Sequence, residues 1–183
     1  MGINDADNSY TVVNFESNNN TITVITITNI NTAYTLIDFV GGTNTVTSLI
    51  TAGLNSSYTQ VNFYGDSGTL TNYNIKTSGS SNASIQVYGN SNTFTTCKVV
   101  TKDKSNLNIT IDGDSNTATT GLITVLDSGR VNILMNKSDT ITDLKMYSSD
   151  NSIVTYNMPG VSTTDTTRNM TGTGVQVNTV NFK

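Results

Sequence analysis

The chain has 183 residues, of which 12% are charged and 35% apolar, and its formal net charge is −4. This acidic balance argues against nucleic-acid binding through a basic surface, and no apolar run approaches the ~18 residues of a membrane span. With no histidine and a single cysteine, the chain cannot form a histidine-based catalytic triad, a histidine–metal site or an internal disulfide. We therefore expect no cofactor, metal, nucleic-acid partner or membrane partner.

A short phrase of alternating apolar residues returns along the whole chain. Its first residues are 24 apart, except for one step of 23. The phrase occurs as Val13-Asn14-Phe15, Ile37-Asp38-Phe39, Val61-Asn62-Phe63, Ile85-Gln86-Val87, Ile109-Thr110-Ile111, Ile133-Leu134-Met135, Tyr156-Asn157-Met158 and Val180-Asn181-Phe182. Strands at a fixed period without a helical pattern predict an all-β protein, a right-handed parallel β-helix of about 7.5 coils of 24 residues.

Each coil is predicted to hold three short strands. The first carries the phrase and one more inward position, such as Thr35. The second is a Thr-x-Thr segment, and the third alternates again, as at Ile25 and Ile27. Corners rich in Gly, Asn, Asp and Ser, such as 65–68, separate the strands. The 23-residue step falls in the corner 136–139, where a deletion does not reverse the facing of a strand.

The repeat predicts a single domain over residues 1–183. Residues 1–8 are assigned to an N-terminal lead-in. Repeat arrays need covered ends, so we expect either partner subunits or an irregular cap formed by residues 163–174. The first seven residues lack the pattern of a signal peptide. The protein is therefore expected in a virion, or outside the cell after removal of a signal.

The Thr-x-Thr segments predict two outward rows of threonine on one face, because their middle residue is apolar in every coil. The rows contain Thr21, Thr45, Thr69, Thr93, Thr117 and Thr140, and Thr23, Thr47, Thr71, Thr95, Thr119 and Thr142. Strand preference and hydrogen bonds between coils explain such rows structurally. A binding face is the functional alternative.

A second outward feature is an aromatic and aliphatic stripe in the N-terminal half. It comprises Tyr10, Tyr34, Tyr58, Tyr64, Tyr88, Val12, Leu36 and Val40. An apolar stripe on a surface otherwise made of Asn, Ser and Thr indicates a contact site. Subunit packing is the first interpretation, and contact with sugar rings is the second.

Enzymatic activity is not expected. Glu16 is the only glutamate, and the aspartates near residues 112–114 and 139–143 lie in or next to corners without a defined carboxylate pair. Cys97 occupies the same repeat position as Ile25 and Leu49, which predicts a buried, inert thiol.

The repeated segments Ile85–Thr95 and Ile109–Thr119 carry the pattern apolar-x-apolar-x-Gly-x-Ser-Asn-Thr-x-Thr. This pattern resembles the parallel β-helices of phage tailspikes, phage fibres and bacterial adhesins. The resemblance implies a non-enzymatic structural or attachment protein, a virion component that forms homo-oligomers or packs against other structural subunits. The Thr-x-Thr rows resemble the ice-contacting face of β-solenoid antifreeze proteins, which implies ice binding as the alternative. A carbohydrate-binding or carbohydrate-cleaving β-helix is the third.

Overall fold

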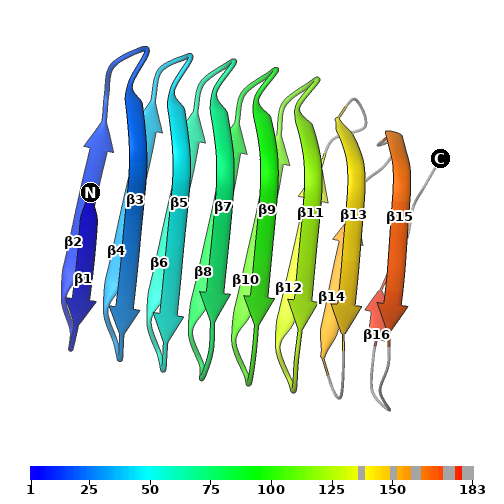
Figure 1. Cartoon of the computed structure of the whole chain (residues 1–183). Helices are drawn as coiled ribbons and strands as arrows, with labels where there is room; N and C mark the ends of the chain where they lie inside the picture. Colours follow the sequence, from blue (N-terminus) through cyan, green and yellow to red (C-terminus); the bar gives the residue numbers. More distant parts are fainter. Residues whose placement is uncertain (136–138, 149–151, 158–161, 171–175, 179–183) are drawn as a thin grey trace.

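The protein is a right-handed parallel β-solenoid. The computed structural model describes residues 1–135, 139–148, 152–157, 162–170 and 176–178. In these residues two parallel sheets of eight strands each lie face to face. In Figure 1 the near strands run down, the far strands run up, and successive coils advance from left to right, which defines a right-handed coil. The predicted fold class and hand are confirmed.

The strands of the two sheets alternate along the chain. Sheet A holds β1 (Gly2–Ala6), β3 (Thr21–Ile30), β5 (Thr45–Leu54), β7 (Thr69–Thr77), β9 (Thr93–Thr101), β11 (Thr117–Val125), β13 (Thr140–Ser148) and β15 (Ser162–Met170). Sheet B holds β2 (Tyr10–Phe15), β4 (Tyr34–Val40), β6 (Tyr58–Tyr64), β8 (Asn82–Tyr88), β10 (Asn106–Asp112), β12 (Arg130–Met135), β14 (Ile153–Asn157) and β16 (Gln176–Asn178). Within the described ranges, no helix is long and apolar enough to cross a membrane.

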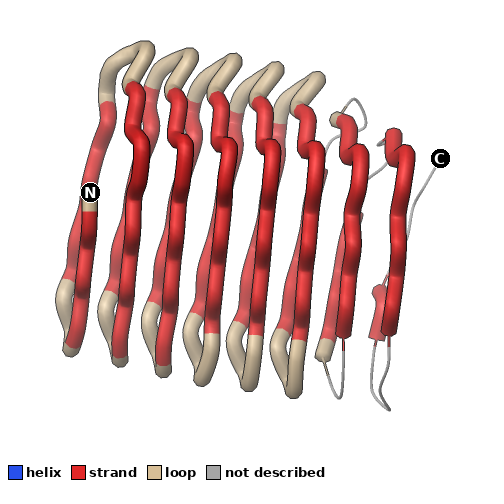
Figure 2. The backbone as a smooth tube through the Cα atoms, viewed as in Figure 1, coloured by secondary structure: helices blue, strands red, loops and turns tan. Residues whose placement is uncertain are grey.

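Each coil has two strands, so the prediction of three short strands per coil is wrong. The predicted second and third strands form one long strand of sheet A, which bends near its start (Figure 2). The bend lies at the second threonine of the Thr-x-Thr segment. Between β3 and β5, Thr21 pairs with Thr45 and Ile22 with Val46, and pairing resumes at Val24↔Ser48. The second threonines, Thr23 and Thr47, are not paired. An interrupted ladder bends a strand without ending it.

The predicted period holds for most of the chain. Paired residues are 24 apart from Gly2↔Thr26 onward and 23 apart at Thr117↔Thr140. The pairs Thr140↔Ser162 and Ile153↔Gln176 are 22 and 23 apart, and the last predicted phrase, residues 180–182, lies outside the described residues. The described residues form about six complete coils, and 7.5 were predicted. The last turns include residues outside the described ranges.

Two segments predicted to lie outside the regular coils belong to sheet A. Residues Gly2–Ala6 of the lead-in form β1, which pairs with β3. Residues 163–170 of the predicted cap lie in β15, which pairs with β13. Residues 171–174 lie outside the described residues.

The inward apolar columns of both sheets meet in one core. Ile37, Phe39 and Leu49 are fully buried, and the rings of Phe15, Phe39 and Phe63 stack with centroids 4.9 and 4.7 Å apart. The side-chain period of two places these residues inside, as predicted. Burial of this apolar surface is the main stabilising contribution to each coil, about 25 cal/mol per Å².

The interior also holds polar side chains, and one group of them near the N-terminus is joined by hydrogen bonds. Asn29 is fully buried, and its Nδ2 donates to Thr59 Oγ1 and to the Tyr58 carbonyl, both at 2.8 Å. Thr35 Oγ1 donates to Asp5 Oδ2 at 2.7 Å. These hydrogen bonds offset the cost of removing the polar groups from water.

A buried ladder of side chains joins successive coils at one corner. Asn92 Oδ1 accepts from the Gly68 N–H at 2.7 Å, and Asn116 Oδ1 accepts from the Asn92 N–H at 2.9 Å. Asp139 Oδ1 continues the ladder by accepting from the Asn116 N–H at 2.9 Å. In this way the corner backbone donors find partners although water cannot reach them.

The glycine column of the same corner is set by close packing between coils. A Cβ on Gly65, Gly89 or Gly113 would collide with the carbonyl oxygen of the equivalent glycine one coil earlier. The backbone of the earlier coil cannot move away from such a Cβ as the end of a flexible side chain could. Only glycine therefore fits this column where coils stack directly.

This packing predicts that Gly89→Ala lowers the free energy of unfolding by about 1–3 kcal/mol, the usual cost of overpacking. Gly2→Ala is the matched control, because a Cβ there meets nothing within 4 Å, and its effect is expected to stay within about 0.5 kcal/mol. Urea unfolding followed by circular dichroism measures both. Equal midpoints for the two variants would contradict the collision.

Candidate functional site: the tyrosine face of sheet B

Three tyrosines form a ladder on the outer face of sheet B. Tyr10, Tyr34 and Tyr58 occupy paired positions of β2, β4 and β6. Their ring centroids lie 4.8 and 5.1 Å apart, with interplanar angles of 9° and 6°. The rings therefore cover one another's faces and turn their edges and hydroxyls outward. Tyr10, at the end of the ladder, is 68% exposed.

A second ladder lies at the other margin of the same face. Tyr64 and Tyr88 stack with centroids 5.3 Å apart, and Val40 precedes them in the same column. All three side chains are exposed, at 38–41%. Six residues of strand separate Tyr58 from Tyr64, which corresponds to about 20 Å.

A hydrogen-bonded row of polar side chains connects the two ladders. Gln60 Oε1 accepts from the hydroxyls of Tyr58 and Tyr34 at 3.3 and 3.5 Å. Gln60 Nε2 donates to Asn62 Oδ1 at 3.1 Å and to Gln86 Oε1 at 3.4 Å. The Tyr88 hydroxyl then donates to Gln86 Oε1 at 3.2 Å. The chain of contacts thus runs from one ladder to the other.

Asp38 adds a negative charge to the centre of this row. Its Oδ1 accepts from Asn62 Nδ2 at 2.7 Å. Burial raises the pKa of Tyr34, and so do the neighbouring tyrosines and Asp38. Burial, Asp38 and Tyr88 likewise raise the pKa of Tyr64. The phenols therefore keep their protons near neutral pH and remain hydrogen-bond donors.

The structure brings together all eight residues of the predicted stripe on sheet B. Val12 is 43% exposed beside Tyr10, and Leu36 is half-buried beside Tyr34. We call the outer surface of β2, β4, β6 and β8 that carries this stripe and its polar row the tyrosine face. It combines apolar ring edges with fixed amide and hydroxyl groups, an arrangement suited to binding.

The threonine rows lie on sheet A and differ from each other. The first row is paired in register from Thr21 to Thr140. In the second row, Thr47 and its equivalents sit at the bend and are absent from the pairing. Thr23 and Val24 are both exposed, so the outward pattern shifts by one residue there. The side chain of Thr142 lies outside the described residues.

Cys97 lies between the sheets, as its repeat position predicts. Burial raises its pKa from 9.0 to about 12. Its partly accessible surface faces an apolar cavity, which it lines. Because the thiolate is the reactive form, this thiol is inert near neutral pH.

Sequence reasoning missed the polar row and the corner ladder. Gln60, Asn62 and Gln86 stand in outward columns whose residue types vary from coil to coil, so no repeat marked them. The Asn92 column does repeat, as Asn20, Asn44, Asn92 and Asn116, and its regularity was the available signal.

The raised pKa predicts that Cys97 reacts slowly with a disulfide reagent in the folded protein. At pH 8 its thiolate fraction is about 1000-fold below that of a thiol with pKa 9.0, because each pKa unit is tenfold. Absorbance with Ellman's reagent measures the rate, and the protein in concentrated urea is the control. Equal rates in both conditions would contradict a buried thiol.

In the described part of the chain, no group of three or more His, Cys, Asp or Glu side chains is placed to hold a metal ion. Comparison of the chain with protein-family models, curated proteins and solved structures found no match.

Proposed function

We propose that this protein is a non-enzymatic structural or attachment component of a virion fibre, spike or capsid surface, which associates with further copies of itself through the tyrosine face. The observation that carries the self-association is the pair of exposed tyrosine ladders joined by a polar row on one sheet. The similarity of its repeated coil pattern to phage-fibre β-helices supports the virion setting. Capsid or tail genes beside its gene would agree with that setting, and a secretion operon would contradict it.

The orientation of the rings favours a protein partner over sugar stacking. Sugars stack on the faces of aromatic rings, and in the ladders a neighbouring tyrosine covers one face of each ring and both faces of Tyr34. What remains exposed is a ridge of ring edges and hydroxyls beside Val12 and Val40. Tyrosine-rich patches with a polar surround are typical of protein interfaces.

A second copy of the chain matches this face because it carries the same apolar ridge and the same polar row. Two copies related by a two-fold axis can set the apolar ridge of each against the other. The Asp38 carboxylate already accepts a hydrogen bond from Asn62, which offsets part of its desolvation cost. The face measures roughly 20 by 20 Å, about half of the ~800 Å² per partner of a stable interface. We therefore expect weak association, with a dissociation constant in the micromolar range or above, which multivalency would strengthen.

The proposal predicts concentration-dependent association that Tyr34→Asn weakens at least tenfold. A tyrosine at the centre of an interface contributes about 2 kcal/mol or more, and asparagine occupies this column at Asn82 and Asn106. Sedimentation velocity at rising protein concentration measures the effect.

Ile50→Asn is the matched control on the opposite sheet. Ile50 is 38% exposed on sheet A, and Asn74 is its partner in the next coil. This variant is expected to associate like the wild type. A monomeric wild type at millimolar concentration, or equal weakening by both substitutions, would refute self-association through the tyrosine face.

Ice binding is the second candidate, and the observation that favours it is the in-register first threonine row. If this row contacts ice, Thr93→Tyr abolishes thermal hysteresis, because the ring disrupts the row. Thr124→Tyr is the control, since its partner in the next coil is Tyr147 on the same sheet. Absence of thermal hysteresis in the wild type eliminates this candidate.

A further inference from the structure

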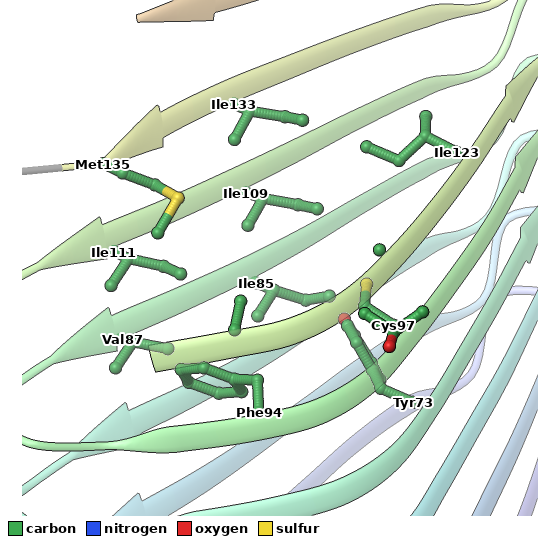
Figure 3. Close-up of a pocket in the computed structure, with 13 residues that line it drawn as sticks. Tyr73, Ile85, Val87, Phe94, Cys97, Ile109, Ile111, Ile123, Ile133 and Met135 are labelled. Atoms are coloured by element: carbon green, nitrogen blue, oxygen red, sulfur yellow. The ribbon is translucent and has the colours of Figure 1, made fainter. Parts of the chain in front are cut away.

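The core contains an apolar cavity of about 70 Å³ between the two sheets. Figure 3 shows the isoleucines of sheet B, among them Ile85 and Ile109, facing Phe94, Cys97 and Ile123 of sheet A. Met135 and Val87 lie at the same end of the space. Its lining is therefore almost entirely hydrocarbon and sulfur.

Two small residues in one coil create this space. Ala118 occupies the column of Val46, Leu70 and Phe94, and Gly121 occupies the column of Leu49 and Tyr73. β11 keeps the continuous parallel pairing with β9 and β13 on both sides of Gly121, as its neighbours do. The backbone therefore cannot move inward to fill the missing volume, and a cavity remains.

The chemistry of the lining excludes a stable water. A buried water needs two to four polar partners. The Tyr73 hydroxyl is buried and has no hydrogen-bond partner, and Figure 3 shows it pointing toward Cys97. Burial raises the pKa of both groups, so the space contains no charge. Thr120 is the third polar residue of the lining, but no polar surface of the three residues faces the space, so the cavity supplies no water site.

We propose that this cavity is a binding site for one small, neutral, apolar molecule of a few heavy atoms. An apolar protein cavity of about 150 Å³ stays dry and takes benzene or xenon. The cavity here has about half that volume, so it selects guests smaller than benzene.

Xenon is the probe for this site. Methyl carbon–proton NMR spectra of the full chain are recorded at rising xenon pressure. Saturable shifts are expected for the methyl groups of Ile85, Ile109, Ile123 and Met135, which line the cavity. Absence of saturable shifts at these methyls, or shifts confined to surface methyls, would overturn the proposal.

Substitutions at Ala118 test whether filling the cavity prevents xenon binding, and a substitution outside the cavity is the control. Ala118→Leu places in β11 the residue that β7 carries at Leu70, and it is expected to weaken xenon binding at least tenfold without lowering the unfolding midpoint. Ala118→Ile is a second variant with the same expectation. Ala52→Leu, half-buried on the outer side of sheet A, is the control and keeps the wild-type response. If folded Ala118→Leu and Ala118→Ile both bind xenon like the wild type, the site is elsewhere and the proposal fails.

Discussion

In the described residues each strand pairs in parallel with the strand one coil away, and this pairing places most side chains against their own equivalents in the repeat. Such contacts favour residues that stack well on copies of themselves. Phe39 stacks on Phe63, and Tyr34 on Tyr58, at nearly the separation of the strands. The corner amides and the glycine column follow the same rule. Each amide accepts a hydrogen bond from the backbone of the preceding coil, and each glycine avoids a collision with that backbone.

The same rule explains where the molecule departs from regularity. The hydrogen bonds between coils prevent the backbone from moving to fit an unusual residue. A larger residue therefore fits an inward column only where the surrounding side chains are small enough, and a smaller residue leaves an empty space. Ala118 and Gly121 are the small residues, and the cavity beside Cys97 is the consequence. The bend at the second threonine is the other departure. It shifts the outward pattern of sheet A by one residue and leaves only the first threonine row fully paired.

On the outer face of sheet B, stacking between coils and contacts along a strand act together. The ladders run along the solenoid axis, while Gln60 connects Tyr58 to Asn62 along a single strand. Side chains that would be mobile individually are thereby held in one arrangement. A preordered surface loses less conformational entropy when a partner binds.

The period of 24, the parallel β-helix and the facing of the inward columns could all be predicted from the sequence, because alternation and repetition are local properties. The members of the tyrosine stripe could be predicted for the same reason. The number of strands per coil could not, since a bend and a corner both interrupt alternation and only the backbone path distinguishes them. The edge-on orientation of the rings and the cavity beside Ala118 depend on contacts between residues about one coil or more apart. The polar row through Gln60 combines such contacts with hydrogen bonds along a strand. Tertiary structure alone decided them, because hydrogen bonds and empty volume arise only where the coils meet.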